Sequence, residues 1–204
     1  MTDLTLYLAL PSRGITVLWM LEELGQSYDM QVLDLSKREH KTPEFLAINP
    51  MGRVPVLRHG DQLISESVAI CTYLAETFPD AGLSIPVGHP ERGHYLQWIL
   101  FGPGTLEPSI IWKATGDPSA EYQPFPSIDD VASTLAGALR DREFLVADRF
   151  TTADVIVGSG VMWGTRMMPV LPKLPEIESY WRRLEARSAW QRTRQIFEPR
   201  LATS

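Results

Sequence analysis

Residues 49–70, NPMGRVPVLRHGDQLISESVAI, read as a loop, a strand, a tight turn, a second strand and the beginning of a helix. We expect the strands at residues 54–57 and 62–64, and Gly60 between them supplies the positive φ that a hairpin turn needs. Pro55 removes an N–H group from the first strand, which suits a segment whose backbone is reserved for an outside partner. The peptide bond before Pro55 is therefore a candidate for the cis form.

The residues that follow the second strand indicate a helix N-terminus. Ser65 is placed to cap the free N–H groups of this helix, and a helix N-terminus favours a carboxylate. Glu66 offers the complementary negative charge for an ammonium group, so the segment suits an amino-acid head group. The alternative is that Ser65 and Glu66 only start a helix.

The motifs NPMGRVPVL and ESVAI, within a thioredoxin-like order of elements, resemble the glutathione-binding domain of the glutathione transferase superfamily. The resemblance implies that the backbone of Val54, before a cis Pro55, pairs with the cysteinyl part of glutathione. It also implies that Glu66 and Ser67 hold the γ-glutamyl end. The two motifs at this separation are more specific than either one alone.

The composition is ordinary for a globular protein, with 204 residues and a formal net charge of −6. No basic cluster supports nucleic-acid binding, and no apolar run approaches the roughly 20 residues that a membrane-spanning helix needs. The N-terminal sequence lacks a signal-peptide pattern. The single cysteine, Cys71, excludes an internal disulfide and a C-x-x-C redox pair, so we expect a structural cysteine in a cytoplasmic protein.

The order of the expected elements predicts two domains. Strands at residues 4–10 and 28–35 flank a helix that begins near Ser12, which fits a β-α-β unit with a parallel pair of strands. The hairpin and its helix complete a thioredoxin-like half. The glutathione transferase fold is thus expected as an α/β thioredoxin-like domain, a linker and an all-α domain, at residues 1–79, 80–90 and 91–204.

The second half of the chain reads as helices. Thr151 and Asp154 have the spacing of a capping box, and the helix that they open is apolar on all sides, so it should run through the centre of its domain. Gly102-Pro103-Gly104 should break or kink an earlier helix. FTTADV and ARSAWQRT also resemble segments of the family, whereas the loop over residues 115–126 is the part about which the resemblance says least.

The reaction that the family implies is attack of the glutathione thiolate on an electrophile. Because a thiol with a pKa near 8.5 is mostly protonated at neutral pH, a donor group has to favour the thiolate. The candidates are Ser12, at the beginning of the first helix, and Tyr7, with Arg13 as a helper. The alternatives are that Ser12 is an ordinary helix cap and Tyr7 a core residue. The serine that theta-type members place before the Pro-x-Arg turn is missing here, and the match is closer to members with Ser-Arg at the helix start.

The glycyl carboxylate of glutathione needs donors on another segment. The theta-like pattern Lys-x-x-His-x-x-x-x-Phe recurs at Lys37, His40 and Phe45, which implies His40 as a donor. Lys41 and Arg53 are nearby cations that could assist, and the alternative for Lys41 is a solvated loop charge. No spacing of histidines suggests a metal site, so glutathione is the only expected cosubstrate.

The pocket for the electrophile is expected between the domains by analogy with the family. Its candidate residues are equally plausible as core residues, and they are Leu8, Leu10, Trp98, Phe101, Leu106 and Trp112.

The leading hypothesis is a homodimeric glutathione transferase that acts on small apolar electrophiles. The same site could support peroxidase, dehalogenase or isomerase chemistry. The rival class is a non-catalytic glutathione-binding or protein-interaction member of the fold. A glutaredoxin-like reductase is weakened by the absence of a cysteine near Ser12.

Overall fold

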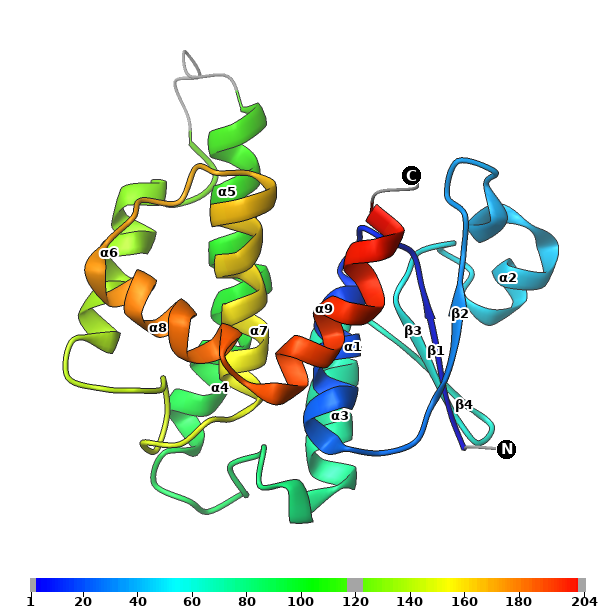
Figure 1. Ribbon diagram of the computed structural model, residues 1–204, viewed down its shortest axis with the longest axis horizontal. Coiled ribbons are helices and arrows are strands. Elements are labelled where there is room, and N and C mark those ends of the chain that lie inside the picture. Colours follow the sequence, from blue (N-terminus) through cyan, green and yellow to red (C-terminus); the bar gives the residue numbers. More distant parts are fainter. Residues whose placement is uncertain (1–2, 117–122, 202–204) are drawn as a thin grey trace. The chain divides into compact units, whose positions relative to one another are not determined.

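The computed structural model describes residues 3–116 and 123–201 (Figure 1). The chain divides into two compact units, Met1–Ala81 with Ser188–Ser204, and Gly82–Arg187. The first unit therefore takes in the last helix, which the sequence placed in the second domain, because this helix packs against the first helix of the chain. The boundaries of independently stable domains stay a prediction.

The first unit is an α/β unit built on a four-stranded mixed sheet with the order β2-β1-β3-β4. Its strands are β1 Leu4–Leu8, β2 Asp29–Val32, β3 Val56–His59 and β4 Gln62–Ser65, and its helices are α1 Gly14–Leu24, α2 Pro43–Ile48, α3 Ser67–Thr77 and α9 Ser188–Leu201, with short 3₁₀ turns at Glu39–Lys41 and Pro79–Ala81. β1 pairs with β2 in parallel and with β3 antiparallel, and β3 pairs with β4 antiparallel. This is the predicted thioredoxin-like arrangement.

Helices cover both faces of this sheet (Figure 1). α1 and α3 pack together on one face, with α9 against α1. On the other face α2 brings Phe45 against Tyr7 of β1 and Val56 of β3, and all three are buried. Cys71 of α3 is fully buried, which raises the pKa of its thiol, so this cysteine is structural, as expected.

β1 and β2 end earlier than the sequence predicts, and β3 begins later. The predicted strand over residues 28–35 ends at Val32, because the side chain of Asp34 accepts a hydrogen bond from the backbone of Ser36 at 2.9 Å and closes a turn there. β3 begins at Val56, since Pro55 has no N–H group to give to the ladder. Gly60 has the predicted positive φ, 57°, in the hairpin turn.

The predicted cap of α3 is wrong. Ser65 is the last residue of β4 and pairs with Val56, so it lies in the strand, one residue before the N-cap position. Glu66 occupies the N-cap position with φ 69° and ψ 115°, and no side chain among the described residues caps α3. The first N–H groups of α3 are therefore left for another partner.

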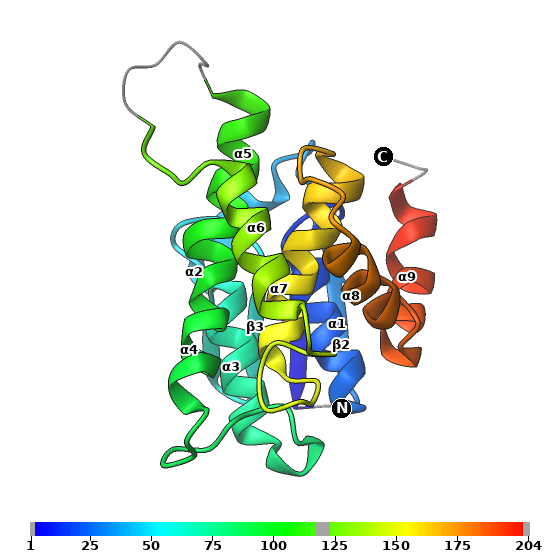
Figure 2. The same ribbon diagram turned by 90° about the vertical axis from the view of Figure 1, so that its left-hand side faces the viewer.

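The second unit is helical. Its elements are α4 Arg92–Phe101, a π-helical turn Gly102–Leu106, α5 Glu107–Thr115, α6 Ile128–Leu139, α7 Thr152–Met162, a second π-helical turn Trp163–Met167 and α8 Pro175–Glu185. The predicted break at residues 102–104 is the first π-helical turn, which carries α4 into α5 (Figure 2). Every residue of α7 is buried, as predicted. Of the predicted loop over 115–126, residues 117–122 lie outside the described residues. No described helix has the length and apolar character needed to cross a membrane.

The predicted capping box at the beginning of α7 is present and is the centre of a larger network. The carboxylate of Asp154 accepts hydrogen bonds from the backbone N–H of Thr151 at 2.9 Å and from that of Leu145 at 3.0 Å. It also accepts one from the hydroxyl of Tyr180 on α8, at 3.0 Å. Burial raises the pKa of Asp154 to about 6, although these hydrogen bonds act in the opposite direction.

This burial predicts a pH-dependent stability. Because the pKa of Asp154 is higher in the folded chain than its ordinary 3.8, the stabilising contribution is complete below pH 3.8 and is lost as the pH rises through about 6. The loss amounts to at most about 3 kcal/mol, since one pKa unit corresponds to about 1.4 kcal/mol. The measurement is the difference in unfolding free energy between wild type and Asp154→Asn from pH 4 to 7. A difference that does not vary over this range would contradict the prediction.

Candidate functional site

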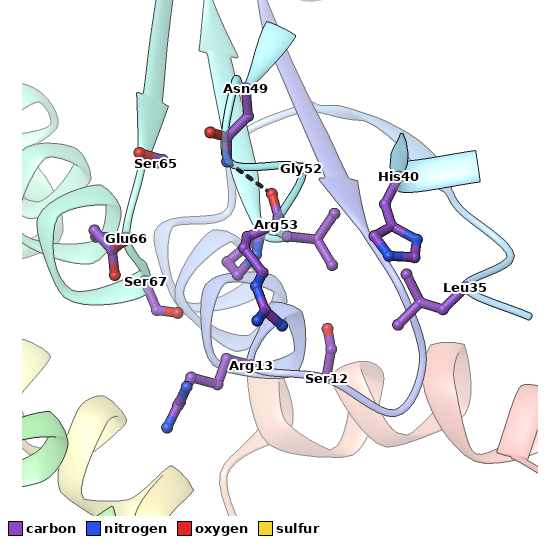
Figure 3. A pocket seen from close by; sticks show the side chains of 12 residues that line it. Ser12, Arg13, Leu35, His40, Asn49, Gly52, Arg53, Ser65, Glu66 and Ser67 are labelled. Carbon is purple, nitrogen blue, oxygen red and sulfur yellow. Dashed lines mark hydrogen bonds between the residues drawn. The ribbon is translucent and has the colours of Figure 1, made fainter. Parts of the chain in front are cut away.

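The first unit contains a cavity of about 430 Å³ at one end of its sheet. Four segments meet there, because β1, β2 and β4 end at this end of the sheet and β3 begins there. Its lining residues are Ser12, Arg13, Leu35, His40, Asn49, Gly52, Arg53, Val54, Pro55, Ser65, Glu66 and Ser67. Figure 3 shows Glu66 and Ser67 on one side of the cavity, His40 and Leu35 on the other, and Ser12 and Arg13 between the two sides.

Most of the residues predicted to bind glutathione line this cavity, and two predicted site residues do not. The Lys41 ammonium donates a hydrogen bond to the carbonyl of Met51 at 2.9 Å. Tyr7 is 6% exposed and packs edge-on against Phe45, with ring centroids 6.2 Å apart, so it is placed as a core residue. Lys37 also lies elsewhere, with its ammonium 3.1 Å from the Asp34 carboxylate.

Sequence reasoning did not assign Leu35, Asn49, Gly52 or Ser65 to the site. Asn49 and Gly52 lie inside the motif that carried the resemblance, and a glycine two residues before Val54 is a signal for a special backbone conformation. Gly52 indeed has φ 57°. Leu35 has no signal of its own, because only the meeting of the strand ends places it at the cavity. Ser65 has a signal as a neighbour of Glu66, but the sequence predicts it only as a helix cap.

The main chain at Val54 is available to a ligand. The Val54–Pro55 peptide bond is cis, as predicted, and the Leu10–Pro11 bond is cis as well, which was not predicted. Val54 precedes β3 and lies outside its ladder of hydrogen bonds, whose first pairs are at Val56. The backbone of Val54 is therefore placed at the cavity as an unpaired strand edge would be.

Ser12 lies in the loop between β1 and α1. Its hydroxyl donates a hydrogen bond to the carbonyl of Ala9 at 2.6 Å and accepts one from the N–H of Gly14 at 3.0 Å. Ser12 thus binds the first N–H group of α1 without being its N-cap residue, since Arg13 occupies that position. The only hydroxyl proton of Ser12 points to Ala9, so it has to turn before it can be donated to a ligand.

Glu66 is held in an unusual backbone conformation. A non-glycine residue with φ near 69° is uncommon and costs about 1–3 kcal/mol, and such residues cluster at binding sites. Glu66 directly precedes α3, where the uncapped N–H groups and the helix dipole favour an anion. A carboxylate beside an anion-binding helix end matches a ligand that carries both an ammonium and a carboxylate.

Cationic side chains lie in the middle of the cavity, between Glu66 on one side and His40 on the other (Figure 3). Arg13 and Arg53 both line it and both are exposed. The Nδ1 atom of His40 is buried and has no hydrogen-bond partner among the described residues. Because an unpaired buried polar atom costs free energy, a polar group of a bound ligand would stabilise the site by forming a hydrogen bond with this nitrogen.

Comparison with known proteins shows which family has this fold. The chain matches the model of the glutathione S-transferase N-terminal domain over residues 2–76 and that of the C-terminal domain over residues 107–188. It is 37% identical over 155 residues to glutathione S-transferase 1 of Schizosaccharomyces pombe, which covers 68% of this chain and 66% of that protein. It is 29% identical over 208 residues to probable glutathione S-transferase GSTF2 of Oryza sativa, which covers 91% of this chain and 96% of that protein.

Solved structures agree with this assignment. A glutathione transferase of Phanerochaete chrysosporium, crystallised with oxidized glutathione, has a TM-score of 0.80 at 27% identity, over 99% of this chain and 98% of that one. A theta class glutathione S-transferase of Xanthomonas axonopodis, with glutathione bound, has a TM-score of 0.76 at 28% identity, over 95% and 97% of the two chains. The fold, the matched domain models and these relatives agree, and the chain belongs to the glutathione transferase superfamily.

Proposed function

We propose that this chain is a glutathione transferase, which binds glutathione in the cavity of its first unit and activates the thiol for attack on a small apolar electrophile. The observation that carries the proposal is that one cavity joins the main chain of Val54, the start of α3 and His40. These are three recognition elements for three parts of one extended tripeptide. The family and the relatives crystallised with glutathione support the same ligand.

The proposed pose follows the cavity from one side to the other. The γ-glutamyl group lies on Glu66 and Ser67, with its carboxylate toward the N-terminus of α3 and its ammonium toward the Glu66 carboxylate. The cysteinyl part pairs with the backbone of Val54. The glycyl carboxylate lies toward His40 and Arg53, which supply charge-assisted donors.

In this pose the thiol lies toward Ser12 and the beginning of α1. The Ser12 hydroxyl turns from Ala9 to donate to the thiolate sulfur, and the helix dipole of α1 adds to the stabilisation. The guanidinium of Arg13 adds positive charge near the sulfur. Together these groups lower the pKa of the bound thiol, so that more of it is thiolate at neutral pH.

Ser12→Ala is expected to raise the pKa of bound glutathione by about one unit, which corresponds to about 1.4 kcal/mol. Turnover at pH 7 should fall about tenfold, glutathione affinity should stay nearly unchanged, and alkaline pH should recover part of the loss. The measurement is the ultraviolet absorbance of the thiolate against pH for both proteins. Superimposable titration curves would remove Ser12 from the mechanism and leave the backbone amides of α1 as the activating group.

A non-catalytic glutathione-binding member is the second candidate, because the only Ser12 proton is held by the Ala9 carbonyl at 2.6 Å. A titration with glutathione, followed by turnover assays with a small aromatic halide and with a hydroperoxide, separates the possibilities. Binding with conjugation of the halide supports the transferase. Binding without turnover supports the second candidate, and turnover of the hydroperoxide alone indicates a peroxidase. No binding of glutathione would overturn the proposal.

The remaining proposals concern the electrophile pocket, the oligomeric state and the location of the protein. Leu8, Leu106 and Trp98 are buried within their own units, which favours core roles for these three pocket candidates. We keep Leu10, Phe101 and Trp112 as candidates for an apolar lining. We also propose a homodimer, because α4 exposes Leu96 and Leu100, 41% and 63%, one helical turn apart. The cytoplasm is the proposed location, because a single free cysteine suits a reducing compartment.

A further inference from the structure

Asn49 holds the loop that leads to Val54. Its side-chain amide donates a hydrogen bond to the carbonyl of Arg53 at 2.8 Å, and its side-chain carbonyl accepts one from the N–H of Met51 at 3.2 Å. Its backbone carbonyl accepts another from the N–H of Gly52 at 2.8 Å. Asn49 is 7% exposed, so these bonds lie largely out of water. One residue thus joins the beginning of the 49–54 loop to its end.

The same loop is also attached to the segment that carries His40. The Lys41 ammonium donates a hydrogen bond to the carbonyl of Met51 at 2.9 Å, across the loop from Asn49. Gly52, with φ 57°, lies so close that an added Cβ would stand 2.6 Å from the carbonyl oxygen of His40 and 2.7 Å from the Lys41 nitrogen. Only glycine fits there, and the two segments are held in one relative position.

We propose that Asn49 and Lys41 are positioning residues for glutathione binding in this protein. They hold the 49–54 loop so that Arg53 and the backbone of Val54 face the cavity, and they do so through the loop rather than through contact with the ligand. The polar atoms of Asn49 already bind the loop, and Lys41 does not line the cavity. The inference rests on the proposed function and replaces direct binding by Lys41 with an indirect role.

The physical reason is preorganisation. A backbone that pairs with a ligand has to be ordered, and ordering a free loop at the moment of binding costs conformational entropy. The hydrogen bonds of Asn49 and Lys41 order this loop before the ligand arrives. The loss of these hydrogen bonds should therefore weaken the binding of any ligand that pairs with Val54, whether or not the ligand has a glycyl group.

Lys41→Met tests this by comparing two ligands in calorimetry, glutathione and γ-glutamylcysteine, which lacks the glycyl group. A positioning role predicts about the same loss for both ligands, roughly 3- to 10-fold, as for one hydrogen bond. Direct contact with the glycyl carboxylate predicts a loss for glutathione alone, and this result would overturn the inference, as would unchanged affinity for both. Lys37→Met is the matched control, because it removes the same charge four residues away and should change neither affinity.

Asn49→Ala gives a second readout that needs no ligand. Hydrogen exchange at the amide of Met51 should become at least about tenfold faster than in the wild type, because the side-chain carbonyl of Asn49 holds this N–H group. Glutathione affinity should fall, whereas the pKa of the bound thiol should stay unchanged. Unchanged exchange would overturn the role of Asn49. If this variant does not fold, the ligand comparison with Lys41→Met decides alone, and a wild type that binds no glutathione would refute the proposed function itself.

Discussion

Replacing Glu66 and Ser67 together by alanine is expected to weaken glutathione binding by about 3–6 kcal/mol, or roughly 10²- to 10⁴-fold. Both residues line the cavity, and both stand where α3 begins without a side-chain cap. The change removes the negative charge that would face the ammonium and the hydroxyl that would face the carboxylate, and charge-assisted hydrogen bonds contribute about 1.5–3 kcal/mol each. Isothermal calorimetry of the folded variant measures the loss.

Cysteinylglycine provides the control for this prediction. It lacks the γ-glutamyl group, so its weaker binding should be the same in the wild type and in the double variant. Equal losses for glutathione and cysteinylglycine would mean that the substitutions disturb the cavity as a whole. An unchanged affinity for glutathione in a folded double variant would show that the γ-glutamyl end binds elsewhere.

Asp154→Ala is expected to destabilise the chain by about 3–5 kcal/mol, more than the 0.5–2 kcal/mol of an ordinary N-cap. The reason is that several buried donors would be left without an acceptor. The N–H groups of Leu145 and Thr151 and the hydroxyl of Tyr180 all bind this carboxylate, and all are buried. Each would lose its partner without gaining water, at about 1–3 kcal/mol apiece. Denaturant unfolding at pH 7 gives the free energy.

Asp130→Ala is the matched control. Asp130 stands at the same position relative to its N-cap, Ser127, and accepts a hydrogen bond from the Ser127 hydroxyl at 2.6 Å, but this pair is exposed. We expect a loss of about 0.5 kcal/mol there, because water replaces the lost hydrogen bond. If the two variants lose the same stability, the network around Asp154 adds nothing to its cap.

The fold could be predicted from the sequence because its signals are local. Gly60 predicts its turn, the spacing of Thr151 and Asp154 predicts a capping box, and the uniformly apolar segment after them predicts the buried helix α7. The errors lie at the ends of elements. There, competing hydrogen bonds decide where an element ends. Asp34 binds the backbone of Ser36 after β2, and Ser65 pairs with Val56 in β4, where the sequence predicts a helix cap.

The candidate site also contains residues that the sequence could predict and residues that only the folded chain places. The motif residues Val54, Pro55, Glu66 and Ser67 could be proposed from the sequence, because they lie close together along it and their chemistry matches one ligand. Lys41 could not be placed, since its ammonium is equally able to reach a ligand or a backbone carbonyl, and only the folded loop at Met51 decides. The same holds for Tyr7, which a strand position leaves free to face a site or the core.

The sequence by itself therefore determined the family, the order of elements and the segments that build the cavity, because each depends on residues that are neighbours along the chain. The tertiary structure alone decided which side chains reach that cavity. Leu35 and Ser65 join it because the mixed sheet brings the ends of its strands to one place. Lys41 instead binds Met51, because the 49–54 loop lies beside its segment. It also decided that Asp154 binds Leu145 and Tyr180 as well as its own helix, since those contacts join residues that are distant in sequence.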